Sequence, residues 1–348
     1  MVSKHSDCSD DAACTREVAE MRKSIGIDVS KEKLDLCWLR DRQTRKKKSK
    51  VFKNQRASFA QLVTWVLSNT GAEPQDIQIT LEATGVYHEA LVYYLHEQGF
   101  TIFMANPGKA KKYAESIGLT HKTDKSDAAM LSYYGEEQPQ DIRLWQPEAP
   151  EVRELKSLMR RLSALEKDRQ REHNRLESCE ISDTSDRVRQ SLHEMITVIE
   201  VEIEKLKQNI DEHIDRHPPL KKNRQLLESI KGIGEVMSRE LTYLFAAKRF
   251  KTAKQVAAYM GLIPKMKESG KVKGYTALSK TGPSHLRAKL YMAAVTAKQH
   301  NPDIRRQYER LLAAGKTKMS ALGAAMRKLV QVCFGVVKNQ SEFQVQTA

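Results

Sequence analysis

Four acidic residues in the first part of the sequence could act together as a metal site: Asp28, Glu82, Asp124 and Asp127. Carboxylate oxygens are hard ligands of the kind that Mg²⁺ prefers. One or two such ions can activate a nucleophile and clamp a scissile phosphate. The residue types therefore suggest phosphodiester chemistry, provided that the fold brings the four side chains together.

Asp28 and Glu82 lie in stretches with the alternation of a β-strand. In SIGIDVS (24–30) the apolar residues share one face, which leaves Gly26 and Asp28 on the other. In DIQITLEA (76–83) the polar face ends with Glu82. A carboxylate buried there without a partner would be costly, so each must be protonated, solvated at a cleft or neutralised by a cation.

Asp124 and Asp127 stand three positions apart in THKTDKSDAAML (120–131), which puts both on one face of a helix. One interpretation is helix capping, with Asp124 as the N-cap and Asp127 favourable in the first turn. The other is that the pair completes the magnesium site. The nearby Lys122 and Lys125 would then suit a phosphate substrate.

Short strands alternating with helices must position these acids. We expect strands at 24–30, 33–40, 48–54, 76–83 and 101–106, and helices at 56–70, 87–99, 106–118 and from near Asp124. Three strands in succession followed by helix-strand alternation predict a mixed sheet with helices packed on it.

From Pro150 to about His217 the sequence is charged and strongly helical, with a break at 178–186. Before the break, leucines from Leu155 to Leu176 fit one apolar seam. After it, a second seam has the spacing of a heptad repeat: Leu192, Ile196, Ile199, Ile203, Leu206 and Ile210. The pattern is typical of a helical hairpin or coiled coil, and the stripe could pack within the chain or between chains.

The region after 218 is predicted to be mostly helical, with glycine-bearing loops. SIKGIGEVM (229–237) could be a helix-hairpin-helix, whose turn amides bind phosphate, or a plain helix-helix turn. A basic segment follows, expected as a flexible loop that approaches a sugar-phosphate backbone. Its cations are Lys265, Lys267, Lys271, Lys273, Lys280 and Arg287. The residues alone do not choose a nucleophile among Ser269, Ser279 and Ser284.

The bulk properties favour nucleic acid as a partner. The 348 residues include 59 Lys and Arg against 44 Asp and Glu, which gives a net charge of +15, and a basic surface attracts polyanions. A solubilising surface excess is the alternative. The five cysteines are scattered without a CxxC pair, and no uncharged apolar run is long enough to span a bilayer. We expect a soluble cytoplasmic protein with no membrane partner.

Several motifs together resemble the DEDD transposases of bacterial insertion sequences, also described as bridge-RNA-guided recombinases. They are IGIDVSKEKLD, LEATGVYHEALVYYL, ANPGKAKKYAESIGLTHKTDKSDAAML, LLESIKGIGEVMSREL, FKTAKQVAAYMGLIPKMKESGKVKG and LSKTGPSHLRAKLYMAAV. The resemblance implies a RuvC-like, RNase H-type α/β domain at 24–148, a helical coiled-coil middle at 149–218 and a mostly helical transposase domain at 219–340. Residues 1–23 are a polar extension without a counterpart in the pattern.

The resemblance also implies roles for the candidate residues. Asp28, Glu82, Asp124 and Asp127 would hold Mg²⁺, and Ser269 would attack DNA to form a phosphoserine link. The implied partners are element-end and target DNA, a noncoding guide RNA and further copies of the chain in a dimer or tetramer. Two alternatives remain: a RuvC-like nuclease or junction resolvase that uses water, and a non-enzymatic nucleic-acid-binding protein.

Overall fold

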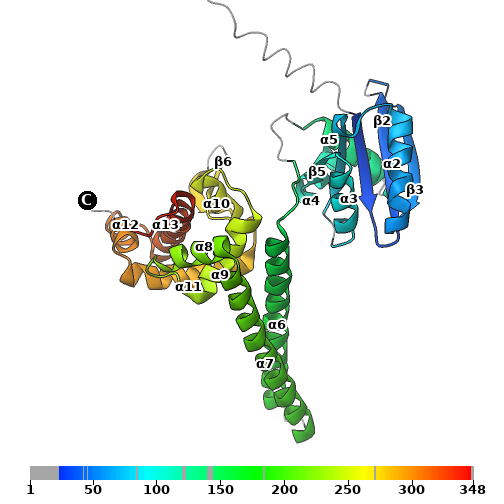
Figure 1. Cartoon of the computed structure of the whole chain (residues 1–348). Helices are drawn as coiled ribbons and strands as arrows, with labels where there is room; N and C mark the ends of the chain where they lie inside the picture. Colours follow the sequence, from blue (N-terminus) through cyan, green and yellow to red (C-terminus); the bar gives the residue numbers. More distant parts are fainter. Residues whose placement is uncertain are drawn as a thin grey trace, which may run out of the picture. The chain divides into compact units, whose positions relative to one another are not determined.

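The computed structural model describes residues 23–345, apart from residues 42, 45, 84, 120–122, 139–143, 183–184 and 270–271 and the side chains of residues 125 and 266–276. The chain forms two compact units, of which the first ends at Pro147 and the second begins at Glu148. Figure 1 shows the elements of both units.

A five-stranded mixed sheet with the strand order β3-β2-β1-β4-β5 forms the centre of the first unit (Figure 1). β1 pairs antiparallel with β2 and parallel with β4; β2–β3 is antiparallel and β4–β5 parallel. The strands are β1 (Lys23–Val29), β2 (Lys33–Asp41), β3 (Lys46–Lys53), β4 (Ile77–Glu82) and β5 (Thr101–Ala105). The mixed sheet is confirmed and is consistent with an RNase H-like domain.

Helices cover both faces of this sheet. On one face, α2 (Arg56–Thr70) and α3 (Glu89–Glu97) pack on the apolar stripes of β1 and β4. On the other face, α4 (Pro107–Ser116) and α5 (Asp124–Glu136) pack with β5 around Phe103 and Ala105. A short 3-10 helix (Pro74–Asp76) precedes β4. The small and polar residues of β1 and β4 therefore face α5.

Two glycines allow α5 to lie very close to the sheet. A Cβ on Gly26 of β1 would be 2.0 Å from the carbonyl oxygen of Ala128, and a Cβ on Gly135 of α5 would be 1.9 Å from Oγ1 of Thr80. Ser24 Oγ donates to the Ser132 carbonyl at 2.6 Å. These contacts fix the height and direction of α5 over β1 and β4.

The second unit begins with a two-helix arm, α6 (Pro150–Ile181) and α7 (Asp186–Arg216). The heptad stripe of α7 packs against α6 of the same chain: Leu155, Leu162 and Leu165 share a buried cluster with Ile199, Ile203 and Ile210. The heptad stripe of α7 therefore packs within the chain, which is one of the two alternatives that the sequence left open. Contact between chains through other faces of the arm stays a prediction.

The remaining helices enclose a separate core. They are α8 (Pro218–Glu228), α9 (Glu235–Ala247), α10 (Ala253–Tyr259), α11 (Ser284–His300), α12 (Pro302–Ala313) and α13 (Lys318–Asn339). Within the described residues, α13 alone has the length and apolar composition of a membrane span. Its Leu329, Val330 and Cys333 are buried in the core of this unit, which is the environment of an ordinary core helix.

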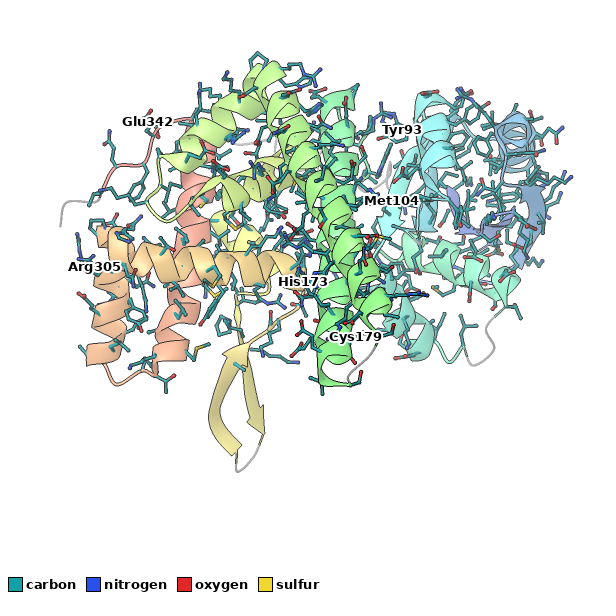
Figure 2. All side chains as sticks on the ribbon, turned by 90° about the horizontal axis from the view of Figure 1, so that it is seen from below. Tyr93, Met104, His173, Cys179, Arg305 and Glu342 are labelled. Carbon is teal, nitrogen blue, oxygen red and sulfur yellow. The ribbon has the colours of Figure 1, made fainter. Side chains whose placement is uncertain are left out.

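The basic segment that we expected to be a flexible loop is a β-hairpin, so that expectation is wrong. β6 (Pro264–Ser269) pairs antiparallel with β7 (Val272–Leu278). Figure 2 shows the hairpin extending away from the helices of its unit. The lysines and glycines suggested a loop, whereas Val272, Tyr275 and Thr276 are residue types that favour strands. The two-residue connection at 270–271 lies outside the described residues.

The close approach of α5 predicts that Gly26→Ala is strongly destabilising. The new methyl group would overlap backbone atoms of α5, which cannot move aside as a side chain can, so we expect a loss of about 3 kcal/mol in the free energy of unfolding. Chemical denaturation measures this change.

Gly335→Ala is the matched control, because a Cβ at that helical position meets nothing within 4 Å. Alanine is the better helix former, so this variant should be neutral or slightly stabilised. Equal stability of the two variants would contradict the close packing of α5.

Candidate active site

The register of the parallel strands places Asp28 beside Glu82. Ile27 of β1 pairs with Leu81 of β4. The next residues of the two strands, Asp28 and Glu82, therefore lie side by side on the face that carries α5. Both side chains are partly exposed, as expected at the carboxyl end of a strand. Two of the four predicted acids are therefore neighbours in the sheet.

The start of α5 carries the other two acids, and the structure corrects the capping interpretation. The N-cap is Thr123, whose side chain accepts from the Ser126 amide in a capping box. Asp124 is the first helical residue, so it does not serve as the N-cap. Both acids lie in the first turn, where the helix dipole favours negative charge. Asp124 is exposed and Asp127 is half-buried.

The electrostatics show that the acids act on one another. The pKa of Asp28 is raised from 3.8 to about 6. Burial is the largest cause, followed by repulsion from Asp127, Asp124 and Asp35. Because like charges raise the pKa of a carboxyl only over short distances, the end of β1 and the start of α5 converge. Glu82 is not among these causes, so its placement rests on the strand register.

Asp35 and Lys33 belong to the same site, although the sequence analysis did not select them. Asp35 is the antiparallel partner of Asp28 and is only 7 % exposed. The Lys33 ammonium lies 3.1 Å from Asp35 Oδ2 and 2.6 Å from Asp124 Oδ2, so it bridges β2 and α5. The available signal was strand alternation, since Lys33, Asp35 and Cys37 share the face opposite Leu34 and Leu36.

The donor set fits a hard divalent cation in its chemistry. Asp124 and Asp127 both raise the pKa of Asp28 by repulsion, and the Lys33 ammonium binds Asp124. A cation between these carboxylates would remove the repulsion that raises the pKa of Asp28. No three Asp, Glu, His or Cys side chains among the described residues form a ready-made metal cluster.

Ser269 is the last residue of β6, next to the hairpin connection. Its side chain lies outside the described part of the chain. The two rival serines have different positions: Ser279 Oγ shares a hydrogen bond of 3.0 Å with Thr281 Oγ1, and Ser284 begins α11. Ser269 is therefore the one of the three that lies at the tip of the hairpin.

The structure describes the side chains of three of the predicted phosphate-binding residues, Lys265, Lys280 and Arg287. Lys265 and Lys280 are exposed, and Lys280 has a positive φ of 54°. Arg287 donates from Nη1 to the Met260 carbonyl at 3.2 Å, so part of its guanidinium serves the fold. The other predictions lie outside the described side chains: Lys122, Lys125, Lys267, Lys271 and Lys273.

The glycine turn between α8 and α9 has the geometry of a tight helix-helix connection. Gly232 has a φ of 104° and packs against Ala297, which leaves no room for a Cβ. Gly234 is the N-cap of α9, and a Cβ there would meet nothing within 4 Å. The turn therefore presents open backbone at the start of α9.

Comparison with known proteins identifies relatives over most of the chain. A model of DEDD transposases of the IS110 type matches residues 25–179, and a model of the transposase IS116/IS110/IS902 family matches residues 224–309. Pilin gene-inverting proteins of Moraxella lacunata and Moraxella bovis are each 29 % identical to the chain. Each alignment covers 92 % of this chain and 97 % of the relative.

The raised pKa of Asp28 predicts that Asp28→Asn stabilises the metal-free protein at pH 7.5. Because the pKa is about 6 in the folded state and 3.8 ordinarily, ionisation costs the folded state more than the unfolded state. The wild type therefore loses stability as the pH rises from about 4 to 6. In EDTA the variant should melt higher than the wild type above pH 6, and this difference should vanish near pH 4.

Asp41→Asn is the control of opposite sign. Hydrogen bonds from Thr44 lower the pKa of Asp41, so its ionised form contributes stability above its ordinary pKa. This variant should melt no higher than the wild type at pH 7.5. A lower melting temperature of Asp28→Asn at that pH would contradict the crowding of the carboxylates.

Proposed function

Because the chain belongs to the IS110 family of DEDD transposases, we propose that it cuts and rejoins DNA with a magnesium-dependent carboxylate site and a serine nucleophile. The carboxylate site would consist of Asp28, Glu82, Asp124 and Asp127, and the nucleophile would be Ser269. The proposed domains are the RuvC-like domain at 24–148, the helical middle at 149–218 and the transposase domain at 219–340.

One observation carries the metal-dependent part: Asp28 shares its surroundings with the charges of Asp124, Asp127 and Asp35. Such repulsion destabilises the metal-free domain. It serves a function where a cation, alone or bound to a phosphate, enters the site and neutralises the carboxylates. Lys33 binds Asp124 and Asp35 together, so it holds the start of α5 against β2 before anything binds. Asp35 would act as a positioning residue through Lys33.

A bound Mg²⁺ would neutralise the carboxylates and polarise the scissile phosphate. In the metal-free protein, the raised pKa of Asp28 lets the carboxyl keep its proton at mildly acidic pH, so protons would compete with Mg²⁺ for this carboxylate below about pH 6. Hydrogen bonds from Ser24 and Gln78 to the carbonyls of Ser132 and Gly135 hold the C-terminal half of α5 on the sheet, and Lys33 would hold its first turn through Asp124.

The serine step accounts for rejoining. The Ser269 hydroxyl would attack phosphorus, form a phosphoserine ester and release a sugar hydroxyl that takes up the proton. The ester keeps the energy of the broken bond, so a second sugar hydroxyl can attack it and restore the DNA without an external energy source. The relatives are named for inverting a pilin gene, and inversion requires that every cut end is joined again.

The chain would recognise DNA through a noncoding guide RNA, as the family resemblance implies. Phosphate contacts would come from the basic hairpin and from the turn between α8 and α9, where the space beside Gly234 is open. The net charge of +15 supports a polyanionic partner of either kind.

Assembly would use the outer face of the two-helix arm, because the heptad stripe is already buried within the chain. Met195, Val198 and Val201 of α7 are 51 %, 59 % and 49 % exposed. The hollow beside them is lined by Leu165, Met195, Val198 and Ile199 and by charged residues of both helices, namely Arg161, Asp168, Arg171, Glu172, Arg175 and Glu202. Exposed apolar residues surrounded by charges of both signs would fit a second copy of the arm.

The serine assignment predicts a covalent adduct. Incubated with Mg²⁺, element RNA and end-labelled element DNA, the wild type should give a protease-sensitive DNA adduct on a denaturing gel, and peptide mapping should place it at Ser269. Ser269→Ala should abolish the adduct and the strand joining, because no hydroxyl remains to form the ester.

Ser279→Ala and Ser284→Ala are the matched controls and should retain the adduct. DNA cleavage that survives Ser269→Ala without an adduct would instead identify a nuclease that uses water. Binding of DNA with no magnesium-dependent cleavage by any variant would identify a non-enzymatic binding protein.

The assembly predicts that Met195→Glu/Val198→Glu lowers the mass of the protein in solution. Two carboxylates in an apolar contact between copies would be desolvated without partners, so the oligomer should dissociate. Light scattering after size-exclusion chromatography measures the mass. Met292→Glu/Met319→Glu adds the same charge at two other exposed methionines and should leave the mass unchanged. An unaltered mass of the first variant would exclude this face.

A further inference from the structure

The edge strand β3 is the most basic element of the first unit, and neither the sequence analysis nor the proposed function uses it. Its sequence KKKSKVFK contains five lysines in eight residues. From Arg42 to Ala72 the chain has no Asp or Glu. This strand therefore forms a concentrated positive surface, and only Lys46 at its start interacts with a neighbouring acid, Asp41 of β2, among the described residues.

The two faces of β3 differ in what they contact. Phe52 packs edge-on against Trp65 of α2, and the ammonium groups of Lys48 and Lys50 contact Asn69 and the Phe52 ring respectively. These residues define the α2 side of the strand. By alternation, the opposite side carries Lys47, Ser49, Val51 and Lys53, which we name the β3 strip.

The β3 strip lies on the same face of the sheet as the candidate active site. In register, Asp28 pairs with Asp35, and Asp35 pairs with Val51. Lys33, which binds Asp124, pairs with Lys53. With neighbouring strands about 4.8 Å apart, the strip begins roughly 10 Å from Asp28.

The strip is uncovered, although the sheet beside it is not. α5 packs over β1, β2 and β4, and it leaves the neighbouring face of β3 open. All four strip residues are exposed, including Val51 at 57 %. Within the described part of the chain, Lys47 and Lys53 form no ion pair with an acid.

A nucleic-acid backbone is the ligand that this chemistry fits. Lysines are point charges that bind phosphates without reading the bases. Lys47 and Lys53 are six residues apart, which is about 20 Å along a strand. This length corresponds to about six nucleotides at 3.4 Å each. Lysines on an edge strand also discourage aggregation, but that role does not distinguish the two faces.

We propose that the β3 strip binds the backbone of the DNA strand that is being cut, next to the scissile phosphate. The inference rests on the proposed DNA cleavage and adds the path of the DNA away from the carboxylates. DNA is favoured over the guide RNA because of where the strip lies. Asp28 pairs with Asp35 and Asp35 pairs with Val51, so the strip lies two strands away from the residues that would hold the scissile phosphate. Ser49 and Val51 would contact the backbone between the two lysines.

The test compares two double variants of one strand with equal loss of charge. Lys47→Gln/Lys53→Gln changes the strip, and Lys48→Gln/Lys50→Gln changes the α2 side. We measure binding of an element-end DNA duplex to the complex of the protein with element RNA, in EDTA so that no cleavage follows, from about 50 to 200 mM salt. The strip variant should bind about tenfold more weakly at 100 mM salt, and its slope of log K against log salt should fall by about two, one for each lost phosphate contact.

The α2-side variant should bind like the wild type, and melting temperatures should show that both variants are folded. Equal binding by the two variants would overturn the inference. So would a strip variant that loses affinity for the element RNA and not for DNA. Failure of the proposed function is distinguishable, because the wild type itself would then show neither adduct nor cleavage with Mg²⁺.

Discussion

The contact between α5 and the sheet is the constraint on which the rest of the first unit depends. At Gly26 and Gly135 the backbone of the helix and the residues of the sheet approach to distances that no Cβ would allow. Ser24 and Gln78 then hydrogen-bond to the backbone carbonyls of Ser132 and Gly135, in the last two turns of α5. Because the helix is held at several points, its first turn has one position over the carboxyl ends of β1 and β4. Residues chosen for close packing thereby determine where Asp124 can lie.

This geometry creates an electrostatic cost that the fold only partly offsets. Burial and three neighbouring carboxylates oppose ionisation of Asp28. Lys33 joins Asp35 to Asp124 and so compensates one side of the cluster, while no described side chain forms an ion pair with Asp28. A domain selected for stability alone would replace such a residue. The uncompensated charge is therefore the physical reason to regard the cluster as a site, and the basic β3 strip supplies complementary charge for a phosphate chain beside it.

The second unit is held together by a different principle. Its arm buries an apolar seam that continues into Leu220 of α8, and ion pairs add to its junction with the C-terminal helices. Arg239 of α9 forms hydrogen bonds of 2.6 Å with both oxygens of Asp211 of α7, and Arg224 of α8 reaches the same carboxylate. Lys289 of α11 likewise joins Glu240 and Glu166. A bidentate pair fixes direction as well as distance, so the arm leaves the helical core at a defined angle. The hairpin that carries Ser269 extends from this core.

The sequence was enough to predict strands β1 to β5, most helices and the face to which Asp28 and Glu82 belong, because strand alternation and helical periodicity are local properties of the chain. It also indicated the two-helix arm from the spacing of Ile199, Ile203 and Ile210. It did not determine the β-hairpin, where lysine and glycine masked the strand pattern. Nor did it show that Thr123 caps α5, or that Asp35 pairs with Asp28. These features depend on strand register, on how closely a helix approaches a sheet and on which charges then become neighbours. Such distances between remote residues exist only after the chain has folded.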